Sequence, residues 1–345
     1  MNIRPAVDWP AEGLEYLGVC PLCRSTKRRK LREHLTDVTF FAAPGEWTLW
    51  RCLGCRSAYL DPRPNRETIG LAYAEYFTHS LIDPPGPETT MQRIRKKLAN
   101  GYRNARYGTE LTPAWKLGYL VAKLVPSLGK IVDVQFRYLP RASKCGARAL
   151  DIGCGNGAWL SLAKSAGWEV SGVEPDPVAL EQGRSHGLDV RPSLADFEAD
   201  TAGFDYITLS HVIEHVHDPA ATLRTCYKLL RPGGGIFVDT PNVDALGHDL
   251  YGRHWRGLEV PRHLVLFNSE SLARSLKAAG FVQLKHRIRR MFTGMSQKSS
   301  LIAAGKNPES GEALNAAPEM DLVTRLRAAL TRRRSEFLTF TASKP

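Results

Sequence analysis

The sequence has no long hydrophobic run. No stretch of about 18 consecutive apolar residues occurs in it, and the first residues, MNIRPAVDWPAEGLEYL, contain no continuous apolar segment of the kind that directs secretion. The most apolar stretch, residues 117–139, is interrupted by charged residues and a proline, which is typical of amphipathic helices. We therefore expect a cytoplasmic protein without a membrane-spanning helix.

Acidic residues are in the minority. The 345 residues include 47 lysines and arginines against 35 aspartates and glutamates, a formal net charge of +12. The basic residues fall in scattered clusters, a pattern that fits nucleic acid, a phosphorylated small substrate, an anionic membrane surface or simply a solvated basic surface. With 43% hydrophobic and 24% charged residues, the composition excludes a chain that is disordered as a whole. The length accommodates an α/β domain with smaller additions.

Cysteine is sparse, with seven residues in the chain, which excludes a small disulfide-stapled scaffold. Four of the seven form two Cys-x2-Cys pairs, Cys20 with Cys23 and Cys52 with Cys55. This spacing directs both sulfurs of a pair at one metal ion, and four cysteines leave no coordination position for a catalytic water. We predict a structural zinc ribbon over residues 1–62, with a redox dithiol pair as the alternative.

Residues 63–147 follow as a linker or lid. Proline-rich stretches bracket a short helical pattern that carries Tyr73 and Tyr76, and from Thr89 to about Ala142 basic residues alternate with apolar ones at helical spacing. No motif in this segment indicates chemistry by itself. We expect a helical segment that precedes the main domain.

The segment LDIGCGNG in the middle of the chain indicates a nucleotide site. A β-favouring run ends in Gly153, Gly155 and Gly157, and a helical pattern follows, an arrangement in which the backbone approaches a nucleotide closely. The next predicted strand ends in Glu174, where a carboxylate can accept both hydroxyls of a ribose. The motif fits NAD as well as S-adenosylmethionine. However, Asp151, just before the first glycine, would repel a pyrophosphate and attract the ammonium of a methionyl group.

Four segments in order, LDIGCGNG, GVEPDP, FDYITLSHVIEHVHDP and LLRPGGGIFVDTPN, resemble the successive motifs of class I S-adenosylmethionine-dependent methyltransferases. The resemblance is to the small-molecule branch, which includes quinone and sugar methyltransferases. It implies a Rossmann-like α/β domain over residues 148–305: a seven-stranded sheet with helices on both faces, its last strand at residues 299–306 (SSLIAAGK). We expect residues 306–345 to be a basic tail that forms an amphipathic helix.

The same resemblance implies which residues bind S-adenosylmethionine. It assigns Asp151 and the glycine turn to the methionyl and backbone side of the cofactor, Glu174 to the ribose, and the loop from Leu194 to Asp196 to the adenine. Asp196 is equally well explained as a helix cap. The full implied set is Asp151, Gly153, Cys154, Gly155, Asn156, Gly157, Glu174, Pro175, Leu194, Asp196, Ser210 and His211.

On the acceptor side the resemblance points to His215 in the segment IEHV. In sugar C-methyltransferases that also carry a four-cysteine zinc module, a histidine at the matching place works with a tyrosine from the preceding lid, here Tyr76. A histidine suits removal of a proton from an acceptor near neutral pH. His263 in PRHL is a further candidate contact. The alternative for Glu214 and His215 is that they order their loop by hydrogen bonds.

The chain also departs from those sugar enzymes, which continue into a further C-terminal α/β domain, because only about forty residues follow the last predicted strand. This difference argues against methylation at carbon, and we expect methyl transfer to oxygen or nitrogen of a small-molecule or glycan acceptor. A lipid-linked acceptor would bring the basic tail to the inner face of an anionic membrane.

Two other functions stay open. An RNA methyltransferase agrees with the basic clusters, but nucleic acid is the less favoured partner. The four-cysteine ligand set and the stretch AYLDPRP differ from the zinc modules of bacterial ribosomal-RNA methyltransferases. The other alternative is a non-catalytic cofactor-binding protein. Nothing in the sequence predicts the oligomeric state.

Overall fold

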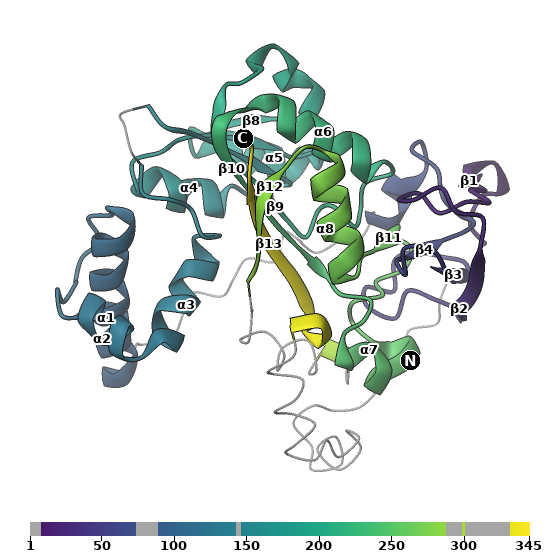
Figure 1. Ribbon diagram of the computed structural model, residues 1–345, viewed down its shortest axis with the longest axis horizontal. Coiled ribbons are helices and arrows are strands. Elements are labelled where there is room, and N and C mark those ends of the chain that lie inside the picture. Colours follow the sequence, from purple (N-terminus) through teal and green to yellow (C-terminus); the bar gives the residue numbers. More distant parts are fainter. Residues whose placement is uncertain (1–7, 74–88, 143–145, 288–298, 301–331) are drawn as a thin grey trace. The chain divides into compact units, whose positions relative to one another are not determined.

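The computed structural model (Figure 1) describes residues 8–73, 89–142, 146–287, 299–300 and 332–345. The chain forms two compact units, each assembled from several segments. Unit 1 comprises residues 1–76, 211–225 and 238–340, and unit 2 comprises residues 77–210, 226–237 and 341–345. Tyr76, the predicted partner of His215, lies outside the described residues.

Unit 2 holds the parallel strands that carry the glycine motif. β6 (Arg148–Ile152) pairs in parallel with β7 (Glu169–Val173) and with β9 (Phe204–Ser210), and β7 pairs in parallel with β8 (Asp189–Arg191). β6 and β9 are almost continuously buried, which is typical of strands inside a parallel sheet. α4 (Ala158–Ser165) follows β6, and α5 (Pro177–Ser185) follows β7. The predicted order of strand, glycine turn and helix is confirmed.

These strands belong to a mixed sheet of seven strands with the order β12-β13-β10-β9-β6-β7-β8. The remaining three strands are β10 (Leu230–Pro241), β12 (Val282–Arg287) and β13 (Phe337–Ser343). The α/β fold with a seven-stranded sheet, predicted from the sequence, is confirmed.

One of the seven strands comes from an unexpected part of the chain. Of the predicted last strand at 299–306, Ser299 and Ser300 are helical and residues 301–306 lie outside the described ranges; the last strand of the sheet within the described ranges is β13. β13 lies in the tail for which the sequence predicted an amphipathic helix, so the helix prediction is wrong for residues 337–343. Leu338, Phe340 and Ala342, every second residue of FLTFTAS, are buried, which is the period of a strand. The expected membrane contact of the tail rests mainly on residues 306–331, which the structure does not describe.

Three helices in unit 2 confirm the helical pattern expected after Thr89. They are α1 (Thr90–Tyr107), α2 (Gly118–Leu124) and α3 (Pro126–Gln135). Thr89 begins α1 with a capping box, since its hydroxyl accepts from the Gln92 amide while the Gln92 side chain accepts from Thr89 N–H. α1 and the start of α2 approach closely because Gly118 has no Cβ; one built there would lie 2.0 Å from the carbonyl oxygen of Leu98.

Unit 1 contains the two cysteine pairs and a four-stranded sheet with the order β11-β4-β3-β2, and Cys52 is the last residue of β3. Its strands are β2 (Arg28–Leu35), β3 (Trp47–Cys52), β4 (Ala58–Leu60) and β11 (Val265–Leu266), and a separate pair is formed by β1 (Leu14–Glu15) and β5 (Arg63–Pro64). Trp47 and Leu60 pack in one hydrophobic core with Trp255 and Leu266. The cysteine-bearing segment thus shares its core with residues from the later part of the chain.

The other helical elements are short. They are η1 (Ala11–Gly13), η2 (Ile69–Tyr73), η3 (Leu194–Asp200), α6 (Pro219–Leu229), α7 (Leu246–Tyr251), η4 (Gly252–His254), α8 (Ser269–Ala278) and η5 (Arg332–Arg334). None of the helices in the described ranges has both the length and the apolar character needed to cross a bilayer.

Candidate functional site

The glycine motif forms the turn between β6 and α4. Gly153, Gly155 and Gly157 have φ angles of 69°, 54° and 81°, a left-handed conformation that glycine adopts readily. The last two glycines have different surroundings: a Cβ on Gly155 would meet nothing within 4 Å, whereas a Cβ on Gly157 would lie 2.4 Å from Leu188 Cδ1. Gly155 therefore leaves space open beside the turn, and Gly157 allows close packing.

Glu174 lies just after β7 and turns towards the glycine motif. Its two carboxylate oxygens accept hydrogen bonds from the backbone N–H groups of Gly155 (2.8 Å) and Asp176 (2.9 Å). Burial raises the pKa of Glu174, while the two amides act in the opposite direction. Each oxygen retains a second lone pair, so the carboxylate can accept further hydrogen bonds from a diol.

Asp151, in β6, is fully buried and already has a cationic partner. Its Oδ1 accepts from Thr208 Oγ1 (2.7 Å) and pairs with the guanidinium of Arg137. Its Oδ2 has no hydrogen-bond partner among the residues that the structure describes. Burial raises the pKa of Asp151, and Arg137 opposes this effect.

Arg137 was not predicted as part of the site. It follows α3, has a φ of 50°, and also donates to Thr208 Oγ1 (2.8 Å). In the sequence it is one of several cations that interrupt an apolar stretch, so its pairing with Asp151 is visible only once the chain is folded. Asp151, predicted to bind the ammonium of the cofactor, thus pairs with a guanidinium from outside the glycine motif.

Around the turn, two further predicted residues have structural contacts. Cys154 is buried, and a Cβ on Gly172 would lie 2.5 Å from its Sγ, so its side chain fills space between the strand and the turn. Asn156 is exposed, and its Oδ1 accepts from the Ala158 amide (3.2 Å) at the start of α4. Pro175 is exposed next to Glu174.

At the predicted adenine loop, Asp196 acts as a helix cap. Its Oδ2 accepts from Ser193 N–H (3.0 Å), while Ser193 Oγ accepts from the Ala195 amide (3.2 Å), and the two form a capping box for η3. Ser193 is thus the N-cap and Asp196 the third residue of η3, so Asp196 takes part in the cap but is not the N-cap residue. The adenine contact of Asp196 and the half-buried Leu194 stays a prediction. Ser210 is half-buried at the end of β9.

The histidines of the predicted acceptor side gather in unit 1. Glu214, His215 and His263 each offer one ligand atom, and these atoms lie within 4.8 Å of one another. The rings of His215 and His263 are 4.7 Å apart between centroids. Two nitrogens and one carboxylate oxygen at this separation can share a proton or hold a metal ion.

His215 is held by hydrogen bonds on one side of its ring. Its Nδ1 lies 3.0 Å from the hydroxyl of Tyr73 and 3.0 Å from the carbonyl oxygen of Arg262. A carbonyl can only accept, so the pair with Arg262 places the proton on Nδ1 and leaves Nε2 as an acceptor. Tyr73 lies three residues before Tyr76 in the same short helical pattern, and no motif in the sequence distinguishes it as a site residue.

His263, in this cluster, and His211, next to it, have pKa values shifted in opposite directions. His211 lies between two buried carboxylates, with Nδ1 3.4 Å from Glu214 and Nε2 3.3 Å from Asp239. Burial alone would lower its pKa, but hydrogen bonds with Asp239 and Glu214 prevail and raise the pKa to about 9. For the buried His263, desolvation outweighs the nearby Glu259 and lowers the pKa to about 4. At neutral pH His211 is therefore a cation and His263 is neutral.

The fully buried Arg262 connects this cluster to the N-terminal part of unit 1. Its guanidinium donates to Asp37 (2.7 Å), to Glu259 (3.3 Å) and to the carbonyl of Ala72 (2.7 Å), next to Tyr73. Its own carbonyl faces His215. One buried residue thus contacts both the segment next to the tyrosine, through its side chain, and the histidine, through its carbonyl.

The four predicted metal ligands come together. Cys20, Cys23, Cys52 and Cys55 have sulfurs within 4.8 Å of one another, with Sγ–Sγ distances of 3.6 Å for Cys20 and Cys55 and 3.5 Å for Cys23 and Cys52. Both Cys-x2-Cys turns have the same backbone hydrogen bonds. The amide of the first cysteine donates to the carbonyl five residues on (2.9 and 3.0 Å), and its own carbonyl accepts from the amide four residues on (2.9 and 3.1 Å).

The comparisons with known proteins agree with the resemblance predicted from the motifs. Residues 129–286 match the family described as "Methyltransferase domain". The ubiquinone biosynthesis O-methyltransferase of Xanthomonas oryzae pv. oryzae is 38% identical over 110 residues, 30% of this chain and 46% of that protein. The protein of the same name from Aromatoleum aromaticum is 40% identical over 109 residues, 29% of this chain and 47% of that protein.

Among solved structures, a SAM dependent methyltransferase from Archaeoglobus fulgidus is similar with a TM-score of 0.44 and 22% identity, over 62% of this chain and 94% of that one. The chain spans about half the length of the curated relatives that it matches.

Proposed function

We propose that this chain, whose residues 129–286 are a methyltransferase domain, transfers a methyl group from S-adenosylmethionine to a hydroxyl of a small-molecule acceptor. The observation that carries the proposal is the pair of Gly155 and Glu174. The open space at Gly155 and the half-buried carboxylate bound to its amide form a surface that suits a ribose diol. The relatives named for O-methylation support a hydroxyl as the acceptor group.

The residues around the glycine turn fit the charges of the cofactor. When bound, the cofactor supplies the methyl group as an electrophile on a sulfonium. Glu174 accepts the ribose hydroxyls, and the orphaned Oδ2 of Asp151 receives the ammonium of the methionyl group. Arg137 pairs with the buried Asp151, opposes the effect of burial on the pKa of that carboxyl, and offers its guanidinium to a carboxylate.

His215 is the proposed base. The proton on its Nδ1 is held by the Arg262 carbonyl, so Nε2 presents the lone pair that takes the acceptor proton. The neighbouring histidines suit this task less well, since His211 is a cation and the neutral His263 has a pKa of about 4. We propose Tyr73, in place of the predicted Tyr76, as the tyrosine that orients His215.

We also propose that the four cysteines bind a structural zinc ion. A tetrahedral site with Zn–S bonds of about 2.3 Å separates its sulfurs by about 3.8 Å, close to the two distances of 3.5 and 3.6 Å in the cysteine cluster. The Cys55 amide lies 3.4 Å from Cys52 Sγ and stabilises a thiolate there. All four positions are taken by cysteine, so the ion supports the fold and takes no part in methyl transfer.

For the acceptor we propose a sugar or glycan hydroxyl. The polar cluster of Glu214, His215 and His263 supplies several hydrogen-bond acceptors close together, as recognition of a hydroxylated molecule requires.

The test is methyl transfer from labelled S-adenosylmethionine to separate pools of nucleotide sugars, lipid-linked glycans, phenolic quinone precursors and ribosomal RNA. We expect label in a sugar-containing pool; label in RNA alone would contradict the acceptor class. His215→Gln should lower turnover at least about tenfold, because a general base typically contributes about 100-fold or more, with cofactor affinity by calorimetry unchanged. His186→Gln, on an exposed side chain in unit 2, is the matched control. Equal turnover of the two variants would remove His215 from the mechanism.

A further inference from the structure

Unit 1 contains a groove lined by arginines that the proposed methyl transfer does not use. The groove has two adjoining parts with volumes of about 180 and 400 Å³, which share Arg56, Asp244 and Arg334. The larger part has the size of a typical small-molecule site. We call it the arginine groove and define it by its six arginines: Arg29, Arg32, Arg51, Arg56, Arg333 and Arg334.

The charges of the arginine groove are only partly balanced. Three carboxylates line it, and each pairs with one arginine: Asp244 with Arg51, Asp249 with Arg334, and Glu270 with Arg333. Within the described part of the chain, the other three arginines, Arg29, Arg32 and Arg56, have no carboxylate at ion-pair distance. The groove therefore has an excess of positive charge that a bound anion can neutralise.

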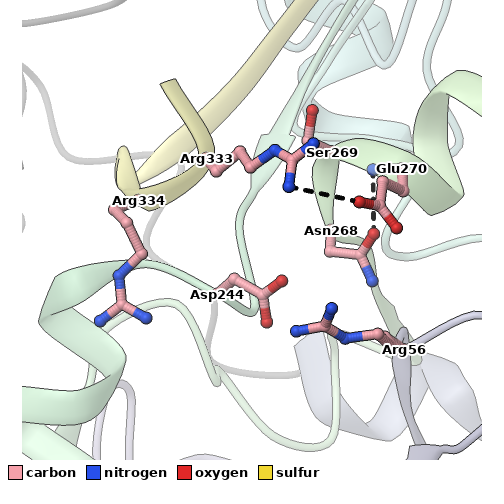
Figure 2. A pocket seen from close by; sticks show the side chains of 7 residues that line it. All are labelled: Arg56, Asp244, Asn268, Ser269, Glu270, Arg333 and Arg334. Carbon is pink, nitrogen blue, oxygen red and sulfur yellow. Dashed lines mark hydrogen bonds and ion pairs between the residues drawn. The ribbon is translucent and has the colours of Figure 1, made fainter. Parts of the chain in front are cut away.

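Arg56 has a fixed backbone position at the junction of the two parts. It follows Cys55 with a φ of 60°, and its amide donates to the Cys52 carbonyl (3.1 Å), so the turn that carries the metal ligands also holds this arginine. Figure 2 shows the Asp244 carboxylate between the side chains of Arg56 and Arg334. Arg56 lines both parts of the groove, so its guanidinium, which has no carboxylate at ion-pair distance in the described residues, is available to an anion in either part.

His248 adds a buried acceptor to the wall of the larger part. Its side chain is 3% exposed, and its ring stacks on Trp255 with centroids 4.8 Å apart. Nδ1 lies 2.8 Å from the Val243 carbonyl and so carries the proton, whereas Nε2 has no hydrogen-bond partner among the described residues. Buried polar atoms are seldom left unpaired, so this lone pair points to a ligand with a hydroxyl or amino group.

We propose that the arginine groove binds a phosphorylated sugar, with the phosphate on the unpaired arginines and a sugar hydroxyl on His248 Nε2. The interspersed carboxylates favour this ligand over a nucleic-acid backbone. Asp244, Asp249 and Glu270 would repel a continuous row of phosphates but accept hydrogen bonds from hydroxyls. This site is separate from methyl transfer and stands without it.

The test is equilibrium binding to the purified full chain by calorimetry, at low salt, with four probes: glucose 1-phosphate, inorganic phosphate, glucose and single-stranded RNA. We expect glucose 1-phosphate to bind at least tenfold more tightly than phosphate or glucose. Arg56→Gln should weaken its binding at least tenfold. Arg66→Gln, the same charge change on an exposed residue of unit 1 outside the groove, should leave it unchanged within twofold.

A second variant tests the sugar part of the site. His248→Phe keeps an aromatic ring on Trp255 but removes Nε2, so the affinity for glucose 1-phosphate should fall to that for phosphate, while phosphate binding stays the same. Thermal denaturation of each variant identifies loss of folding, and Arg56→Gln keeps the proposal testable if His248→Phe does not fold. Equal weakening by Arg56→Gln and Arg66→Gln, absence of glucose 1-phosphate binding, or tighter Arg56-dependent binding of RNA would each overturn the proposal.

Discussion

Replacing Arg262 by methionine should destabilise unit 1 and displace Tyr73. The guanidinium is fully buried between Asp37 and Glu259, and breaking a buried ion pair from one side typically costs about 3–5 kcal/mol. The cost here should lie at the low end. Asp37 keeps backbone amide donors from Thr39, Phe40, Ala42 and Ala43, and Glu259 keeps its ion pair with Arg256. We therefore expect a loss of about 3 kcal/mol.

The pH dependence of this loss gives a second measurement. The Arg262 guanidinium, helped by backbone amides, overcomes burial and lowers the pKa of Asp37 below 3.8. A carboxyl group whose pKa is lowered in the folded state stabilises the fold at any pH above its unfolded pKa. This stabilisation is lost as the pH falls through the pKa of the folded state. The difference in stability between the native chain and Arg262→Met should therefore shrink as the pH falls below about 4.

Urea denaturation followed by tryptophan fluorescence measures both quantities, because Trp9, Trp47 and Trp255 lie in the core of unit 1. Arg66→Met, on an exposed side chain, is the control for the substitution itself. Turnover should also fall, since Arg262 binds the Ala72 carbonyl next to Tyr73. A loss below about 1 kcal/mol at neutral pH, or a difference that persists unchanged at low pH, would refute the argument.

Two further predictions concern His211 and the metal. The pKa of His211 is raised from 6.5 to about 9 in the folded state, so its contribution to stability is complete below pH 6.5 and is lost as the pH rises through 9. The melting temperature of the native chain should therefore decline over this interval. His211→Gln, which cannot titrate, should remove that part of the decline. Cys52→Ser should release zinc and make unit 1 sensitive to protease, including residues 243–266, because these residues share its core. The control Cys226→Ser, in unit 2, should retain the metal. Full zinc content in Cys52→Ser, measured by mass spectrometry, would contradict the ligand set.

The features that the sequence predicts well depend on neighbours in the chain. The glycine turn and the strand before Glu174 are specified by residues a few positions apart. The two cysteine turns likewise assemble from two short motifs, and only their meeting requires the fold. In such places the local backbone determines where the functional atoms lie, so spacing alone identifies them.

The features that the sequence does not predict depend on contacts between distant segments. β13 lies next to β10 although a long stretch of chain separates them. The alternation of apolar and polar residues in β13 is short and directly follows a basic segment, so it does not stand out as a strand in the sequence. Tyr73 and Tyr76 are equally plausible partners for His215 by position. Arg262, which binds the Ala72 carbonyl next to Tyr73, belongs to a different segment of unit 1, 190 residues further along the chain.

Charge state is harder still to predict, because identical side chains differ only through their surroundings. His211 and His263 belong to the same acceptor region, yet one lies between two carboxylates and titrates near 9, while the other is desolvated and titrates near 4. Burial raises the pKa of both Asp151 and Glu174, but the groups that oppose it differ, since Arg137 pairs with the first and backbone amides bind the second. The choice of base among the histidines therefore follows from their contacts: the Arg262 carbonyl holds the proton of His215 on Nδ1, so Nε2 is the nitrogen whose lone pair suits proton removal.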